Sequence, residues 1–143
     1  MRTIKEWLPI AARTLLGLLF TVFGANGFLH FLPNPPSTAA GGAFLGALAA
    51  AGYMFPLIKS TELIAGLLLL GGRFVPLALT LLAPVIVNIV AFHAVLAPAG
   101  VGIALFTVVL EGYVAWTYRA AFAPMLRAGA PAQRTSHHEA AVA

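Results

Sequence analysis

Seven polar side chains lie inside apolar stretches of this sequence, where ionisable and hydrogen-bonding groups are costly and therefore indicate function. The set contains one lysine, two glutamates, two histidines and two asparagines: Asn26, His30, Lys59, Glu62, Asn88, His93 and Glu111. Histidine and glutamate can ligate a hard or borderline metal, hydrogen-bond a polar head group such as that of a quinone, or carry protons. The residue types leave these three chemistries open.

Spacing along the chain predicts which of these residues share a helix face. Asn26 and His30 are four residues apart, and Lys59 and Glu62 are three apart. Each pair therefore falls on one face, and Lys59 can form an ion pair with Glu62 along one helix. No HxxxH or ExxH pair occurs on one predicted helix, so the spacing does not single out a metal site.

Two further positions constrain a single-site interpretation. Asn88 and His93 are five residues apart, which separates them by about 140° on an ideal helix. They point at the same partner only if Pro84 distorts the helix. Glu111 lies deep in its apolar stretch and has no partner on its own helix, so we expect it in the shared polar cluster, paired with Lys59 or a histidine.

Structural roles remain open for the same residues. Lys59 and Glu62 can be a neutralising pair that fixes helix register. His30 can be an interfacial residue hydrogen-bonded to a loop carbonyl. Asn26 and Asn88 fit interhelical hydrogen bonds better than ligand binding.

Composition places these residues in a membrane protein. Of 143 residues, 61% are hydrophobic and 8% are charged, and the mean hydropathy is +0.96. A soluble domain is roughly 45–50% hydrophobic and about 25% charged. A domain this small could not bury the excess of hydrophobic residues. A soluble enzyme, a disordered chain and a nucleic-acid binder are therefore excluded. The absence of cysteine excludes disulfides and thiolate chemistry by this chain.

Four apolar stretches approach the roughly 20 residues that a membrane-spanning helix needs. The predicted spans are about 13–32, 53–70, 75–96 and 101–122. We therefore predict an all-α, four-helix transmembrane bundle over 1–126, followed by a disordered cytoplasmic tail over 127–143. The long apolar region before Pro56 leaves a short interfacial or re-entrant helix at Ala43–Gly52. Pro84 is expected to kink the third span.

Basic residues predict the orientation in the membrane. Seven of them flank one set of span ends and none flanks the other: Arg2, Lys5, Arg13, Arg73, Arg119, Arg127 and Arg134. Lysine and arginine accumulate in cytoplasmic loops, so both termini are expected in the cytoplasm. A bacterial-type inner membrane fits a chain that exports no large domain. In this orientation the seven polar residues lie between the outer surface and the midplane.

At these residues the sequence resembles the DoxX-like family of small four-span membrane proteins, over about residues 8–126. The matching stretches are FGANGFLHFLP (23–33), LIKSTELIAGLLLL (57–70), RFVPLAL (73–79), APVIVNI (83–89) with His93, and AWTYRAAF (115–122). The resemblance implies a four-helix bundle. Some members of the wider family are linked to quinone-dependent sulfur oxidation, and others to membrane oxidoreductase assemblies that handle oxidative stress. Because this chain has no cysteine, a thiol relay would have to use a substrate or partner.

Our leading hypothesis is a redox-linked membrane subunit that binds a quinone or similar small amphiphile in an outer-leaflet polar pocket. Glu62 and Glu111 would accept protons, Lys59 would be the counter-ion, and His30 and His93 would donate to the head group. The sequence contains no recognisable haem, flavin or iron–sulfur motif. We therefore expect a membrane or soluble oxidoreductase partner to supply the electrons.

Two other functions remain as alternatives. A non-enzymatic scaffold or assembly subunit would use the polar cluster only to order the bundle and would present its apolar faces to a larger complex. A small proton-coupled carrier is disfavoured by four short spans without an internal repeat, although a homo-oligomer could supply the missing half.

Overall fold

Helices form the whole framework of the chain that the computed structural model describes, which is residues 4–33 and 37–129. The α-helices are α1 (Ile4–Leu29), α2 (Ala39–Ala50), α3 (Met54–Gly71), α4 (Val75–Val95), α5 (Val101–Thr117) and α6 (Arg119–Phe122). Two short 3₁₀ helices, η1 (Pro98–Gly100) and η2 (Ala123–Leu126), follow α4 and α6. Helices α1, α3, α4 and η1–α5 are long and apolar enough to cross a membrane. The predicted all-α, four-span architecture is confirmed.

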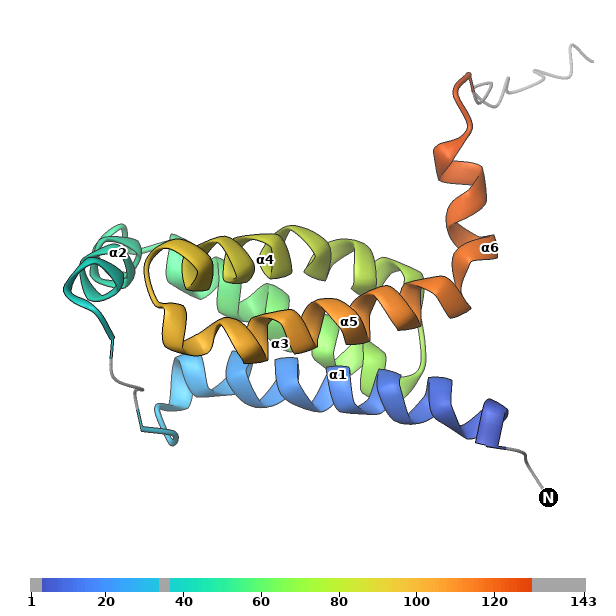
Figure 1. The fold of residues 1–143 in the computed structure, drawn as a ribbon, viewed down its shortest axis with the longest axis horizontal. Coiled ribbons are helices and arrows are strands. Elements are labelled where there is room, and N and C mark those ends of the chain that lie inside the picture. The colour runs from blue at the N-terminus through green and yellow to red at the C-terminus, as the bar shows by residue number, and fades with distance from the viewer. Residues whose placement is uncertain (1–3, 34–36, 130–143) are drawn as a thin grey trace, which may run out of the picture.

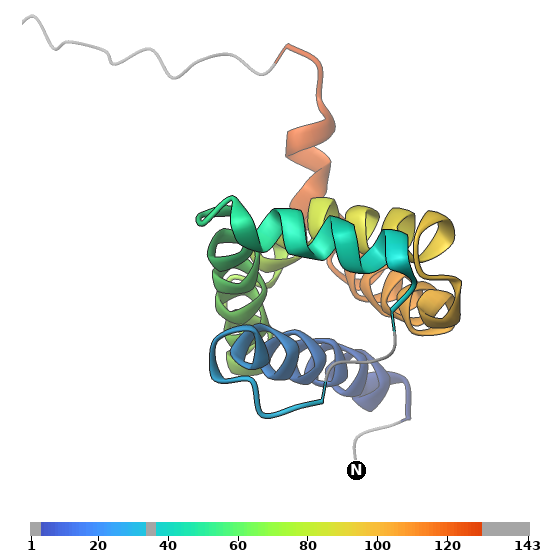
Figure 2. The same cartoon turned by 90° about the vertical axis from the view of Figure 1, so that its left-hand side faces the viewer.

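The four long helices form a closed ring in which each one packs on two neighbours (Figure 1). Helix α1 packs most extensively on α3, and the ring continues through α4 and α5 back to α1. Short connections make α3 run antiparallel to α4, and α4 antiparallel to α5, whereas the longer segment that contains α2 joins α1 to α3. Figure 2 shows the short helix α2 crossing one end of this ring, which we call the α2 end. Helix α1 begins and α5 ends at the opposite end, which we call the terminus end (Figure 1).

Glycines allow the close approach of α1 and α3. A Cβ added to Gly66 would lie 2.6 Å from the backbone nitrogen of Thr21, and one added to Gly24 would lie 2.7 Å from that of Leu63. Small residues at such contacts let helix backbones pack closely where the surrounding lipid provides no hydrophobic driving force. Tight packing of α1 on α3 therefore holds the ring on one side.

The apolar core occupies the part of the ring nearer the terminus end. Its largest fully buried side chains are Leu16, Leu69, Leu82, Val75 and Val114. These residues come from all four long helices, so the core joins the whole ring. The α2 end contains fewer buried apolar residues, and Lys59, Glu62, Asn88 and His93 lie there.

Several boundaries differ from the sequence-based expectation. Helix α1 begins at Ile4, about nine residues before the predicted span, because the helix continues beyond the apolar stretch. The interfacial helix is Ala39–Ala50 rather than Ala43–Gly52, since Thr38 caps its N-terminus by accepting a hydrogen bond from Gly41 N. Helix α4 continues through Pro84.

The last predicted span is shorter than expected. Helix α5 ends at Thr117, and Tyr118 leaves the helical conformation with φ −102° and ψ 13°. The chain then turns away from the ring into α6 (Figure 1). Only 127–129 of the predicted cytoplasmic tail, 127–143, belong to the described residues, so the prediction for 130–143 lies outside them.

Candidate functional site

A buried ion pair marks the polar region at the α2 end. Lys59 Nζ donates to Glu62 Oε2 across 2.7 Å, one turn apart on α3, which confirms the pairing expected from their spacing. The Glu62 side chain is 4% exposed and that of Lys59 is 19% exposed. Lys59 Nζ also lies 5.7 Å from the ring centre of Phe55, within cation–π range. A charge that is both paired and held near an aromatic ring is tolerated in an apolar environment.

The aliphatic stem of Lys59 fits against a glycine of the neighbouring helix. A Cβ at Gly27 of α1 would overlap Lys59 Cγ and lie 2.5 Å from Cδ and 3.0 Å from Cβ. The absence of a side chain at position 27 therefore creates the space that Lys59 occupies. This contact positions the ammonium group over Glu62 from a second helix.

His93, near the end of α4, is held in a fixed orientation by the turn that leads to α5. Its Nδ1 lies 3.0 Å from the carbonyl oxygen of Ala97. A Cβ at Gly100 would overlap the imidazole ring, so the ring packs directly on the backbone of this residue. Phe92 contacts the ring edge-on, with centres 5.1 Å apart and planes at 77°. Three contacts from one segment thus determine where His93 points.

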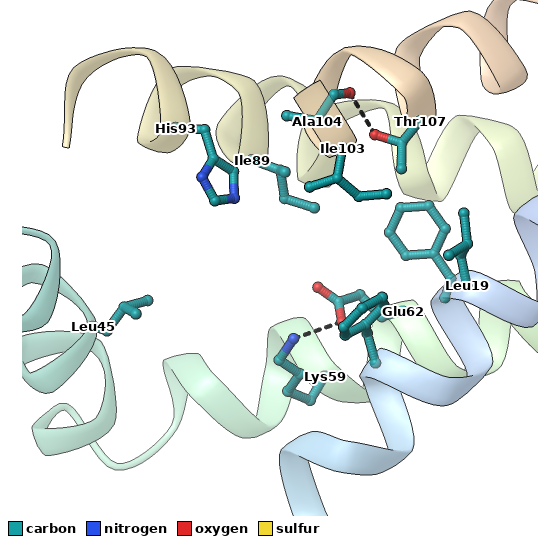
Figure 3. Close-up of a pocket in the computed structure, with 11 residues that line it drawn as sticks. Leu19, Leu45, Lys59, Glu62, Ile89, His93, Ile103, Ala104 and Thr107 are labelled. Atoms are coloured by element: carbon teal, nitrogen blue, oxygen red, sulfur yellow. Dashed lines mark hydrogen bonds and ion pairs between the residues drawn. The ribbon is translucent and has the colours of Figure 1, made fainter. Parts of the chain in front are cut away.

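A cavity of about 270 Å³ lies between these polar groups. Figure 3 shows His93 on one side of it and the Lys59–Glu62 pair on the opposite side. Apolar side chains from all the surrounding helices complete the wall, among them Leu19, Phe20, Phe23, Leu45, Ile89 and Ile103. A mostly apolar cavity with a few convergent polar groups is typical of a small-molecule site.

A second cavity, of about 110 Å³, lies beside the first between α2, α3 and α4. Both cavities are lined by Leu45, Lys59, Glu62, Ile89 and His93. The second cavity adds Asn88, whose side chain is exposed, together with aromatic residues of α2, α3 and α4. Asn88 lines only the second cavity, whereas His93 lines both, so the two residues border the same cavity beside the Lys59–Glu62 pair despite their separation of five residues.

Helix α2 covers this part of the bundle and is attached to it at its first turn. The Thr38 hydroxyl donates to the carbonyl oxygen of Leu96, at the end of α4, while it accepts from Gly41 N across 3.0 Å. Phe44 packs against Phe92, with ring centres 5.7 Å apart. Leu45 of α2 also lines both cavities. The apolar helix α2 therefore provides the wall of the site at the α2 end.

Asn26 and His30 lie at the end of α1 and line neither cavity. Asn26 Oδ1 accepts a 2.7 Å hydrogen bond from Leu32 N and so holds the turn that follows the helix. His30 adopts a left-handed conformation with φ 50°, and its side chain is exposed. Both residues terminate α1, and neither reaches Lys59, Glu62 or His93 through these cavities.

Glu111 also lies away from the two cavities. Thr107, one turn earlier on α5, lines the larger cavity, but Glu111 does not. Its Oε1 atom is buried and has no hydrogen-bond partner among residues 4–33 and 37–129, while Lys59 forms its ion pair with Glu62 instead. Glu111 lies one helical turn after Thr107 along α5, so its side chain lies beyond the cavity, nearer the terminus end.

Backbone features that the sequence reasoning missed shape this site. Gly27 and Gly100 make room for Lys59 and His93, and the Ala97 carbonyl orients the imidazole. A glycine on the helix face opposite a buried lysine is a signal that could have been used. The role of the Ala97 carbonyl has no counterpart in the sequence pattern.

Comparisons with protein-family models, with curated proteins and with solved structures find no match to this chain. Within residues 4–33 and 37–129, no three or more histidine, cysteine, aspartate or glutamate side chains form a group that could hold a metal ion.

Proposed function

We propose that this chain is a DoxX-like membrane subunit that binds a quinone or similar small amphiphile in the cavity at the α2 end. The observation that carries this proposal is the placement of His93 opposite the Lys59–Glu62 pair across an otherwise apolar cavity of about 270 Å³. Such a cavity suits a ligand whose ring or chain is apolar and whose head carries a few hydrogen-bonding atoms.

Access from the bilayer supports an amphiphilic ligand. Phe23 of α1 and Ile103 of α5 both line the cavity, and each is 47% exposed. The cavity therefore reaches the side of the protein that faces lipid, between α1 and α5. A ligand with an apolar tail can insert its head here while the tail remains in the membrane.

The polar residues take distinct roles in this proposal. His93 hydrogen-bonds the head group, Glu62 accepts a proton, and Lys59 is the counter-ion that keeps the Glu62 carboxylate charged near the ligand. A membrane or soluble oxidoreductase partner supplies the electrons. Because Asn26, His30 and Glu111 line neither cavity, the proposal does not use them.

The proposal places the cavity in the outer leaflet of a bacterial-type inner membrane. Arg13, Arg73, Arg119 and Arg127 belong to segments at the terminus end, whereas the stretches 37–53 and 97–100 at the α2 end contain no lysine or arginine. Basic residues favour the cytoplasmic side. Cytoplasmic termini then put α2 at the outer surface.

Ligand binding by the full-length protein in lipid nanodiscs tests the proposal. Mass spectrometry of the gently purified protein is expected to detect a copurifying quinone or related amphiphile. Decyl-benzoquinone and decyl-hydroquinone serve as added probes. We expect at least tenfold weaker binding of decyl-hydroquinone in Glu62→Gln, which removes an acceptor, and at least tenfold weaker binding of both probes in Leu45→Trp, which fills the cavity from α2.

Matched controls separate the site from general effects of substitution. Glu111→Gln makes the same change in a span outside the cavity, and Ala47→Trp puts the same ring on an exposed position of α2 that lines neither cavity. Both are expected to bind as the wild type does. Absence of any bound amphiphile, together with a stoichiometric copurifying protein, would instead favour the scaffold or assembly function.

A further inference from the structure

We infer that the cavity selects a head group that donates a hydroxyl hydrogen bond, in preference to one that carries only carbonyl or ether oxygens. This inference rests on the proposed function and specifies its ligand class as a phenol, a hydroquinone or a similar hydroxyl-bearing amphiphile. It follows from the hydrogen-bonding capacity of the four polar residues that line the larger cavity: Lys59, Glu62, His93 and Thr107.

The backbone determines which nitrogen of His93 carries the proton. A carbonyl oxygen only accepts hydrogen bonds, so the 3.0 Å contact between His93 Nδ1 and Ala97 O requires a proton on Nδ1. In the neutral imidazole the other nitrogen, Nε2, is then an acceptor. A 180° flip of the ring would put Cδ2 against Ala97 O and lose this hydrogen bond, so the contact with the carbonyl fixes the orientation of the ring. His93 therefore presents an acceptor to a ligand.

Glu62 contributes a second acceptor. Its Oε2 atom accepts from Lys59 Nζ across 2.7 Å, as expected of an ionised carboxylate. Figure 3 shows its other oxygen directed into the cavity. An ionised carboxylate has no proton to donate. Two acceptors thus face the cavity, from α3 and α4.

The remaining polar groups do not offset this excess of acceptors. The Thr107 hydroxyl donates within α5, to the carbonyl oxygen of Ala104 across 2.7 Å. Among the side chains that line the cavity, Lys59 is the one with hydrogens left to donate, and a phenolic oxygen can accept from it as a carbonyl can. A hydroxyl head can satisfy both the lysine and an acceptor. A carbonyl head leaves His93 Nε2 without a donor.

An unmet acceptor in an apolar cavity makes binding roughly ten- to a hundredfold weaker. Decylphenol and decylanisole measure this effect directly, because they differ only in the methyl group that replaces the hydroxyl hydrogen and neither undergoes quinone chemistry. In nanodiscs containing the full-length protein, we expect decylphenol to bind roughly ten- to a hundredfold more tightly than decylanisole.

Two histidine variants locate the effect. His93→Phe keeps a ring and removes one of the two acceptors, so the preference for decylphenol is expected to fall severalfold, and the remainder comes from Glu62. His30→Phe makes the same change at an exposed residue outside the cavity, and its preference should match that of the wild type. Equal affinity of the wild type for the two probes would overturn the inference but leave the proposed function standing. Failure of both probes to bind would overturn both.

Nitrogen NMR of the wild-type protein with labelled histidine provides a test that does not depend on whether a variant folds. In the ligand-free protein, His93 is expected as the tautomer with its proton on Nδ1. Addition of decylphenol should shift the Nε2 resonance, whereas addition of decylanisole should not. A proton on Nε2 in the free protein would contradict the inference whatever the affinities are.

Discussion

Gly27 of α1 faces Lys59 of α3 so closely that a methyl group at position 27 would overlap Lys59 Cγ and lie 2.5 Å from Cδ. The contact involves the part of the side chain nearest the backbone, where Lys59 has little freedom to move aside. A single glycine therefore couples the packing of α1 on α3 to the position of the ammonium group over Glu62. The close helix contact and the polar site are one structural feature.

We predict that Gly27→Ala displaces Lys59, lowers thermal stability and weakens amphiphile binding at least severalfold. The added methyl must push the lysine stem, which disturbs the Lys59–Glu62 pair, or separate α1 from α3, which loosens their packing. Gly112→Ala on α5 is the matched control, because nothing lies within 4 Å of a Cβ built there. Alanine stabilises a helix relative to glycine, so this control should be neutral or slightly stabilising. Thermal unfolding in detergent measures both, and a Gly27→Ala protein as stable as Gly112→Ala would contradict the coupling.

The Lys59–Glu62 pair is predicted to respond asymmetrically to removal of its partners. Lys59→Met leaves Glu62, the more deeply buried partner, without its counter-ion, which should cost about 3 kcal/mol of unfolding free energy. Glu62→Met should cost less, since Lys59 is partly exposed and keeps its contact with Phe55. The double variant should recover most of the stability, because apolar residues of similar volume often replace a buried pair without loss.

Unfolding of the four proteins in one detergent completes this double-mutant cycle. If the losses of the single variants simply add in the double variant, the two residues do not stabilise each other, and the pair has no structural role. A recovered double variant that no longer binds the decyl probes would separate the structural role of the pair from its role in the cavity.

Features set by length and local spacing could be predicted from the sequence. Apolar run length indicated four spans, and the three-residue separation of Lys59 and Glu62 indicated their ion pair. Helix ends were predicted less well, because the length of an apolar stretch indicates only the part of a helix that lies in lipid and not the helical residues on either side of it. Helix α1 therefore starts at Ile4, well before its apolar stretch.

The grouping of residues from different helices depends on tertiary structure that periodicity does not encode. Glu111 and Thr107 share a face of α5, yet only Thr107 lines a cavity. His30 terminates α1 in a left-handed conformation and leaves the polar group that we expected it to join. His93 takes its orientation from a backbone carbonyl four residues later. None of these outcomes follows from residue type and spacing alone.

Helix α2 is predicted to loosen when its attachment at Thr38 is removed. Thr38→Ala loses both the helix cap to Gly41 N and the hydrogen bond to Leu96 O, and loss of a cap alone costs about 1 kcal/mol. Hydrogen exchange followed by mass spectrometry should then show that exchange in residues 39–50 is faster than in the wild type, with a smaller change in the four long helices. Thr80→Ala removes an exposed hydroxyl that bonds only within α4, so it should leave α2 unchanged. Equal exchange of α2 in both variants would rule out Thr38 as its attachment.

Single-cysteine labelling tests the proposed orientation, and the absence of native cysteine makes each label unambiguous. Ala51 and Ala128 are exposed residues at the α2 end and the terminus end, respectively. Because basic residues gather at the terminus end, Ala51→Cys should react with a membrane-impermeant maleimide in intact cells. Ala128→Cys should react only after the membrane is permeabilised. The reverse pattern would place α2 and the cavity at the cytoplasmic side, so the ligand would have to enter from the inner leaflet.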